Sequence, residues 1–267
     1  MIPKIIHYCW FGHNPKSELA ERCIGSWKKK CHGYQIIEWN EDSFDLSKSP
    51  LYVQQAYEAK KWAFVTDYVR LYAMTNYGGI YMDTDVEVIK SLNKFLTHEA
   101  FSGFEDETNI PTGIMACRKD FPLFKELLKY YDSASFYNED GSVNLTTNVT
   151  VITNMCLSKG LIQNNQYQVV DGFALYPKEV FCPVSYQTGK LEKTRNTVTI
   201  HWFAGSWQSE ENKKQIEKWR QAVQREEQQK RNQKRQEKKD YIIHTPNRVL
   251  RRLLGEKNYD NLKSKLK

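Results

Sequence analysis

Two aspartates one residue apart, Asp83 and Asp85, follow the apolar run Gly-Gly-Ile-Tyr-Met of residues 78–82. A short apolar run of this kind is typical of a buried strand. Because side chains alternate across a strand, the spacing predicts that both carboxylates face the same side. Two carboxylates that face one spot repel each other unless a cation lies between them. Mg²⁺ and Mn²⁺ bind carboxylate oxygens and keep positions open for phosphate, so the pair predicts a metal-diphosphate site. The alternative is a polar strand end with two solvated aspartates.

A second pair of candidate residues, Asp67 and Arg70, lies one helical turn apart in the predicted helix 51–77. A carboxylate can accept hydrogen bonds from sugar hydroxyls, and the guanidinium fork of arginine suits an anionic diphosphate. The alternative is an ordinary ion pair between residues three apart. We expect this helix to break near Lys61 and to end at the glycine pair.

Two further candidates lie at the ends of predicted strands. Trp10 ends the first strand, 5–10, where ligands bind in open α/β sheets, so its ring could stack on a base; the alternative is a core tryptophan. His201 lies near the end of the strand 198–202 and is followed by a Gly-Ser-Trp turn. His201 and Ser206 could complete a metal shell, and the Trp207 indole N–H could donate to a phosphate; the alternative is a structural histidine.

The elements that must position these residues begin with a strand, a helix and a strand at 5–10, 17–30 and 34–39. This order predicts an α/β sandwich with a parallel sheet. Further strands are expected at 80–82, 86–89, 101–103, 113–117 and 198–202, and further helices at 122–131 and 149–159.

The composition of the 267 residues is that of a soluble globular protein, with 40% hydrophobic and 27% charged residues. The sequence contains no apolar run of the roughly 18–20 residues that span a bilayer, and its first residues read as a strand and not as a signal peptide. Its six cysteines form no Cys-x-x-Cys pair, so neither zinc nor a disulfide framework is indicated and a reducing cytosol is expected.

The net charge of +7 belongs to the last part of the chain. Residues 210–267 hold 18 basic and 9 acidic residues, whereas residues 1–209 hold 21 and 23. We therefore expect a body at 1–209 and a basic helical tail at 210–267. The tail reads as a solvated helix over 210–239, and Thr245-Pro246 signals a second helix start. Residues 241–267 include a basic amphipathic segment that either docks on an anionic membrane surface or remains a solvated helix.

Other chemistries are not indicated by the motifs. The sequence has no phosphate-binding loop, no dinucleotide-binding fingerprint, no Gly-x-Ser-x-Gly elbow and no complete calcium loop. A metal-dependent phosphohydrolase acting through the same aspartates stays open, as does a nucleic-acid-binding protein acting through the basic tail. Nucleic acid is not the expected partner, because the body is acidic and carries no recognition motif.

Four ordered motifs resemble the sugar-binding region of family 32 glycosyltransferases. They are PKIIHYCWFG at 3–12, AFVTDYVR at 63–70, YGGIYMDTD at 77–85 and HWFAGSW at 201–207. That family includes bacterial capsular polysaccharide transferases and fungal mannosyltransferases, and it is similar to the catalytic domain of large clostridial glucosylating toxins. The resemblance covers residues 3–207 and leaves out the tail.

The resemblance implies a GT-A fold, a mixed and mainly parallel sheet flanked by helices. It also implies retaining transfer of a hexose from a nucleotide-diphosphate sugar, a UDP-sugar as the first expectation, with Mn²⁺ or Mg²⁺. The acceptor would be a saccharide or lipid-linked saccharide in capsule or other surface glycan synthesis, at the cytoplasmic face of the inner membrane.

The resemblance also implies a role for each matching residue. The residues assigned to catalysis are Asp67, Arg70, Asp83 and Asp85, and those assigned to the donor are Trp10, Asp67, Arg70, Asp83, Ser206 and Trp207. Asp85 would bind the metal directly, with Asp83, His201 and Ser206 completing its surroundings.

Overall fold

The structure, a computed structural model, describes residues 1–205 and 210–265. The chain divides into two compact units, Met1–Ser209 and Glu210–Lys267, and each is described by itself. The predicted positions Ser206 and Trp207 lie outside the described residues.

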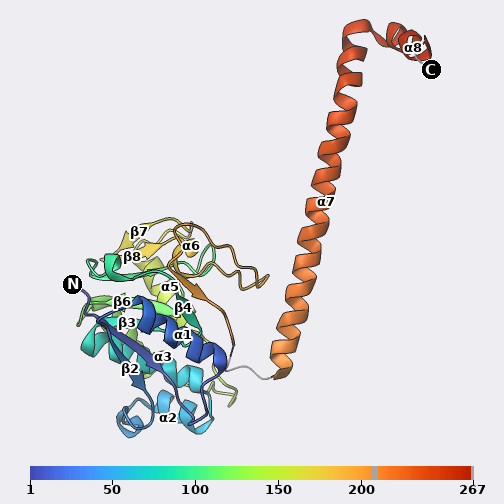
Figure 1. Cartoon of the computed structure of the whole chain (residues 1–267). Coiled ribbons are helices and arrows are strands. Elements are labelled where there is room, and N and C mark those ends of the chain that lie inside the picture. Colours follow the sequence, from blue (N-terminus) through green and yellow to red (C-terminus); the bar gives the residue numbers. More distant parts are fainter. Residues whose placement is uncertain (206–209, 266–267) are drawn as a thin grey trace. The chain divides into compact units, whose positions relative to one another are not determined.

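A seven-stranded sheet with the order β2-β1-β3-β6-β5-β8-β7 forms the centre of the described part of the first unit (Figure 1). Its strands are β1 (Ile5–Cys9), β2 (Gln35–Trp39), β3 (Gly79–Met82), β5 (Ala100–Gly103), β6 (Ile114–Cys117), β7 (Gln168–Val170) and β8 (Phe173–Tyr176). β6 and β7 run antiparallel to their neighbours, and the other five strands share one direction. A separate two-stranded sheet pairs β4 (Val86–Val88) with β9 (Thr199–His201).

Six α-helices are described between the strands of the first unit. They are α1 (Glu18–Lys30), α2 (Leu51–Glu58), α3 (Trp62–Tyr77), α4 (Pro122–Ser133), α5 (Asn148–Ser158) and α6 (Lys178–Phe181), with short 3₁₀ turns at Leu46–Lys48 and Asn93–Phe95. The predicted fold class, a mixed sheet of mainly one direction flanked by helices, is confirmed. The predicted break near Lys61 is confirmed as well, because α2 and α3 are separate helices on either side of it.

Alternate residues of the central strands enter two different cores. Tyr81 of β3 packs with Val69 of α3 in one buried cluster, while Ile80 and Met82 pack with Trp27 of α1 in the other. Side chains that alternate across a sheet bury both of its faces only when each face is covered, so the unit has three layers. The site residues that follow β1 and β3 therefore come from strands held on both sides.

Gly78 makes the sharp change of direction from α3 into β3. Its φ is +67°, and a Cβ atom at this position would lie 2.5 Å from the backbone nitrogen of Lys119. Only glycine meets both conditions without strain. The predicted role of the glycine pair in ending the helix is thus confirmed, and Gly78 is the C-cap of α3.

Three expectations need correction. Asp83 and Asp85 do not lie on a strand: Asp83 follows β3, and Thr84 and Asp85 form the turn before β4. The elements β7, β8 and α6 were not expected, because their three or four residues are too few for a periodic pattern. Thr245-Pro246 does not start a helix but lies within α7 (Glu210–Leu254).

The second unit consists of α7 and α8 (Glu256–Lys265), which are separated by Gly255. Most of the described side chains of α7 before residue 239 are exposed, as expected of a helix made largely of Glu, Lys, Arg and Gln. Among the described residues, no helix is both long enough and apolar enough to cross a bilayer.

Candidate active site

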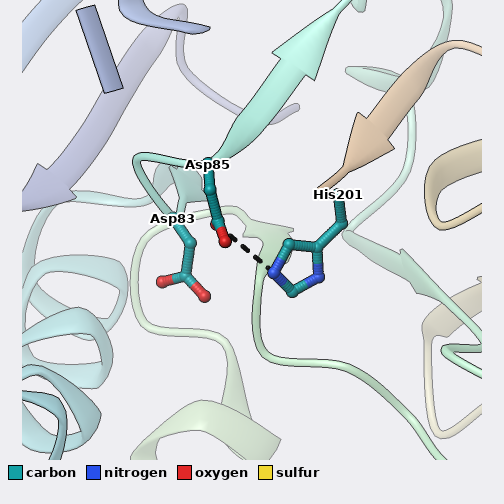
Figure 2. Close-up of side chains that lie close together, drawn as sticks. All are labelled: Asp83, Asp85 and His201. Atoms are coloured by element: carbon teal, nitrogen blue, oxygen red, sulfur yellow. Dashed lines mark ion pairs between the residues drawn. The ribbon is translucent and has the colours of Figure 1, made fainter. Parts of the chain in front are cut away.

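Three side chains from distant parts of the chain converge on one spot. One ligand atom from each of Asp83, Asp85 and His201 can be chosen so that all lie within 4.8 Å of one another. Figure 2 shows both carboxylates and the imidazole around this spot, with His201 Nε2 3.3 Å from Asp85 Oδ1. The two aspartates face the same region because the chain turns between them, with Val86 N–H donating to the Asp83 carbonyl at 3.0 Å.

The pairing of β4 with β9 brings His201 to Asp85. Val86 lies opposite His201 in this antiparallel pair, so the residue before β4 and the end of β9 are neighbours. Trp202 N–H donates to the Asp85 carbonyl at 3.0 Å, and Ala204 N–H donates to Asp85 Oδ2 at 2.8 Å. Asp85 is therefore fixed by the segment that carries the histidine.

The Asp85–His201 contact has the charges of an ion pair. Burial opposes the charged form of Asp85, but His201 and the Ala204 N–H hold the pKa of its carboxyl below the usual value. Burial also opposes protonation of His201, but Asp85 raises the pKa of its imidazole well above 6.5. An imidazole must lose its ring proton before that nitrogen can bind a metal, so a divalent cation and this proton compete for the same position.

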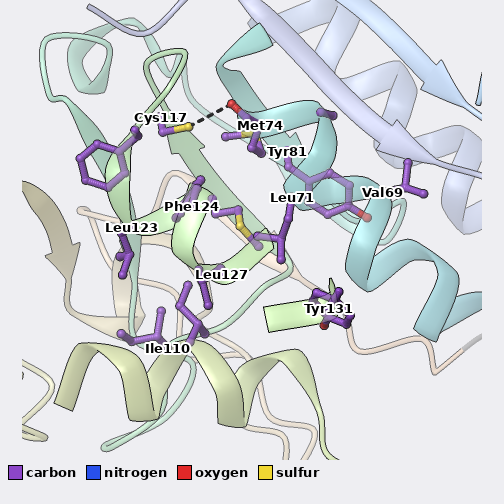
Figure 3. Close-up of a cluster of buried hydrophobic side chains, with 14 of the residues drawn as sticks. Val69, Leu71, Met74, Tyr81, Ile110, Cys117, Leu123, Phe124, Leu127 and Tyr131 are labelled. Atoms are coloured by element: carbon purple, nitrogen blue, oxygen red, sulfur yellow. Dashed lines mark hydrogen bonds between the residues drawn. The ribbon is translucent and has the colours of Figure 1, made fainter. Parts of the chain in front are cut away.

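Asp83 is both a candidate metal ligand and a neighbour of the buried Arg70. Its Oδ1 accepts a hydrogen bond from the Tyr81 hydroxyl at 2.8 Å and lies 3.5 Å from an Arg70 nitrogen. Tyr81 also belongs to a cluster of buried hydrophobic side chains (Figure 3). The carboxylate therefore has one oxygen anchored by the protein.

Arg70 is the central cation of the site, with a side chain only 6% exposed. Its guanidinium lies 3.3 Å from Asp67 Oδ1, donates to the Thr112 carbonyl at 2.9 Å and lies over the Tyr81 ring at 4.8 Å. Burial disfavours its charge, but Asp83, Tyr81 and Asp67 together raise its pKa further. The expected neighbourhood of Asp67 and Arg70 is thus a buried ion pair in the structure, beside Asp83.

Asp67 is a buried carboxylate whose charged form is disfavoured in the folded protein. Burial and the nearby Asp83 raise the pKa of its carboxyl to about 6, although Arg70 and Asn148 act in the opposite direction. The Asn148 amide donates to the Asp67 carbonyl at 3.3 Å, and its buried Oδ1 has no hydrogen-bond partner among the described residues.

We expect Asp67→Asn to stabilise the protein above pH 6. An acid whose folded pKa is raised loses stability as the pH rises from its unfolded pKa through its folded pKa. A neutral amide avoids this cost, and Arg70 keeps Asp83 as an ion-pair partner. The variant should therefore exceed the wild type in unfolding free energy by about 1–3 kcal/mol at pH 8 and match it near pH 4.

Urea unfolding of both proteins at pH 4, 6 and 8 measures the effect of Asp67→Asn. Asp45→Asn is the matched control, because Asp45 is an exposed carboxylate that pairs with Lys48 and so should show no gain at pH 8. A variant less stable than the wild type at pH 8 would contradict the expected burial cost of Asp67.

The remaining predicted residue, Trp10, lies at the carboxyl end of β1, next to β3 in the sheet. Its indole N–H donates to the Asn14 carbonyl at 2.7 Å, and the Lys16 ammonium lies 5.6 Å from its ring centroid. It is partly exposed.

Four residues at the site were assigned no role from the sequence: Tyr81, Thr112, Gly113 and Asn148. Strand alternation could have indicated Tyr81, which is two residues before Asp83. The contacts of Thr112 and Gly113 are made by backbone carbonyls, and Asn148 meets Asp67 across a separation of 81 residues. No sequence spacing signals such contacts.

Known proteins bear out the resemblance seen in the motifs. Residues 17–102 match the family model described as glycosyltransferase sugar-binding region containing DXD motif. This range contains Asp67, Arg70, Asp83 and Asp85. This part of the chain is therefore similar to the sugar-binding region of DXD-containing glycosyltransferases.

Two curated relatives are also described as glycosyltransferases. Inositol phosphoceramide mannosyltransferase 3 of Schizosaccharomyces pombe is 27% identical over 136 residues, which cover 48% of this chain and 36% of the relative. An uncharacterised glycosyltransferase of Acanthamoeba polyphaga mimivirus is 26% identical over 205 residues, covering 68% of this chain and 78% of the relative. The chain thus aligns with only about a third of the yeast enzyme.

Two of the solved structures with a similar fold are described as glycosyltransferases. The glycosyltransferase GlyE of Streptococcus pneumoniae in its apo form has a TM-score of 0.45 at 12% identity, over 77% of this chain and 55% of that one. The PaToxG glycosyltransferase has a TM-score of 0.40 at 21% identity, over 48% and 59%.

Proposed function

We propose that this protein is a metal-dependent, retaining glycosyltransferase of the GT-A type that moves a hexose from a nucleotide-diphosphate sugar to a saccharide acceptor. The observation that carries the proposal is the convergence of Asp83, Asp85 and His201 beside the buried Arg70, within and next to a matched DXD sugar-binding region. A cation site next to a fixed guanidinium is what a departing diphosphate requires.

The donor set fits a hard divalent cation. Two carboxylates supply the oxygen ligands that Mg²⁺ and Mn²⁺ prefer, and the imidazole favours Mn²⁺ because Mg²⁺ is bound almost entirely by oxygen. Asp85 and His201 would hold the ion directly, with Asp83 beside them and Ser206 as a further ligand. When bound, the ion would neutralise negative charge on the diphosphate.

The remaining residues bind and orient the donor in this proposal. Arg70 is already fixed by four protein contacts, so it can stabilise charge on the diphosphate without reorganising. Asp67 accepts hydrogen bonds from hydroxyls of the donor sugar, and Asp83 contacts the ribose and the donor sugar. Trp10 stacks near the base, while Ser206 and Trp207 close over the phosphates.

Retention of configuration is what the resemblance to family 32 glycosyltransferases implies, and no motif carboxylate is free to act as a covalent nucleophile. Asp67 and Asp83 both lie against Arg70, and Asp85 pairs with His201. We therefore infer same-face attack: the bond from the anomeric carbon to the diphosphate oxygen breaks, and the acceptor oxygen bonds to that carbon from the same side. The acceptor proton passes to the departing phosphate oxygen.

The donor is best sought among UDP-hexoses, with GDP-mannose second. The mannosyltransferase name of one relative supports including the mannosyl donor. Thermal shift of the full chain with Mn²⁺ and each nucleotide sugar tests this choice, and a rise in Tm should occur with one donor family only. NMR of the product of that donor should show the donor's own anomeric configuration. Inversion of configuration would overturn the retaining assignment.

The alternative function is a nucleotide-sugar phosphohydrolase that uses the same aspartates. Such an enzyme should cleave the donor as fast without an acceptor as with one, whereas a transferase should hydrolyse it slowly and speed up when a saccharide is added. Nucleic-acid binding is the weaker alternative, because its only support is the charge of the tail.

We propose that residues 241–267 attach the protein to an anionic membrane surface, where a lipid-linked saccharide could serve as acceptor at the cytoplasmic face. The support is the alternation of Arg248, Arg251 and Arg252 with leucine and valine in the sequence. Each basic residue near an anionic surface contributes on the order of 1 kcal/mol, so changing all three to glutamine should weaken vesicle binding about a hundredfold or more.

Co-sedimentation with phosphatidylserine-containing vesicles measures the tail's membrane binding. The matched control changes Arg225, Arg231 and Arg235 to glutamine, which removes the same charge from a part of α7 that lacks interleaved apolar residues. Equal losses of vesicle binding in the two variants would show only general charge attraction. They would reject the proposal that residues 241–267 are a specific membrane-docking segment.

A further inference from the structure

Gly113 lies against the imidazole of His201. A Cβ atom built at Gly113 would lie 2.8 Å from His201 Cε1 and 2.9 Å from Nδ1, closer than carbon atoms approach in proteins. Gly113 is not among the glycines with positive φ, so its backbone conformation is open to other residues. The need for glycine here is therefore steric and comes from the histidine.

The His201 ring is held by three contacts that would oppose its movement away from an added methyl group. Asp85 Oδ1 lies 3.3 Å from its Nε2, and Cys182 Sγ lies 4.0 Å from its Nδ1. The Phe203 ring lies 4.2 Å from it, centroid to centroid, at an angle of 31°. A shift of the imidazole large enough to admit the methyl group would lengthen at least one of these contacts.

The backbone of Gly113 cannot retreat freely either. Its carbonyl accepts the Asp83 N–H at 2.8 Å, and the carbonyl of the preceding Thr112 accepts from Arg70 at 2.9 Å. Two residues earlier, Ile110 N–H donates to Thr153 Oγ1 of α5 at 3.0 Å. A displacement of this segment would therefore move Asp83 or loosen Arg70.

We propose that Thr112-Gly113 is the positioning element of the metal site: its two carbonyls hold Arg70 and Asp83, and the missing side chain of Gly113 makes the space in which His201 meets Asp85. The part of this proposal that concerns the metal rests on the proposed function. The steric coupling between Gly113 and His201 does not depend on it. It assigns Gly113 a positioning role and no contact with substrate.

The test is a double-mutant cycle on the full chain, with Mn²⁺ alone as the probe. Gly113→Ala should weaken Mn²⁺ binding, measured by calorimetry, about tenfold or more, as loss of a partner that orients a ligand does. Its Tm should fall by about 2–6 °C, the shift that a contact-sized loss produces in a domain of this size. In a His201→Ala background the same change should cost less than about 1 °C and no further affinity, because the methyl group fills vacated space.

Gly25→Ala in α1 is the matched control. A methyl group at Gly25 meets nothing within 4 Å, so this variant should keep the wild-type Mn²⁺ affinity and should not lose stability. Equal Tm losses from Gly113→Ala with and without His201 would overturn the positioning role. If the wild type does not bind Mn²⁺, the proposed function fails, and the Tm cycle alone decides the steric coupling of Gly113 to His201.

Discussion

Replacing Asp85 with asparagine is expected to remove metal-dependent transfer while the protein stays folded. The amide keeps an oxygen that can accept the Ala204 N–H, which is 2.8 Å from Asp85 Oδ2. It removes the negative charge that attracts a cation and that raises the pKa of His201. Without this charge the buried His201 can release its proton, so no unpaired cation remains in the core.

The expected loss for Asp85→Asn is about 10²–10³-fold in kcat, the usual cost of removing one group that stabilises transition-state charge. Initial rates of donor turnover with Mn²⁺ and near-native circular dichroism together measure it. Glu87→Gln is the matched control, because it removes the same charge two residues further on, where Glu87 accepts from the Trp202 indole. Full activity of Asp85→Asn would reject the metal assignment.

Replacing Arg70 with methionine is expected to have the largest effect on stability. The change leaves Asp67 and Asp83 without their shared cation, and it leaves the Thr112 carbonyl without its donor. Removing one partner of a buried ion pair costs about 3–5 kcal/mol, because the other charge stays buried and unpaired. The loss should be smaller at pH 5 than at pH 8, since Asp67 can then take up a proton.

Urea unfolding at pH 5 and 8 measures the Arg70→Met effect. Arg118→Met is the matched control: Arg118 also pairs with a carboxylate, Glu99, at 3.3 Å, but its side chain is 35% exposed. Removing such a pair should cost about 1 kcal/mol or less. Similar losses of unfolding free energy for the two arginines would show that burial of the Arg70 ion pairs does not increase their contribution to stability.

Local sequence rules were sufficient for much of the fold. The helix predicted over 17–30 is α1, with Ser17 as its N-cap, and Gly78 ends α3 as the glycine pair predicts. The same rules failed where an element is too short for periodicity, as in β7 and β8. They also fail at Pro246, where they predict a helix start although the residue lies within α7. A proline signal is a local preference, and the continuation of the helix on both sides overrides it.

Residue types and spacing were enough to identify the two aspartates after an apolar run, and Asp67 and Arg70 one turn apart on a helix, as the residues that carry the chemistry. These are short-range relations, set by the chain's own geometry over a few residues. The tertiary structure alone decided that His201 meets Asp85, that Arg70 lies between Asp67 and Asp83, and that Gly113 makes room for the imidazole. Those contacts join residues 13 to 116 positions apart, so only the pairing of strands and the packing of α3 against the sheet could bring them together.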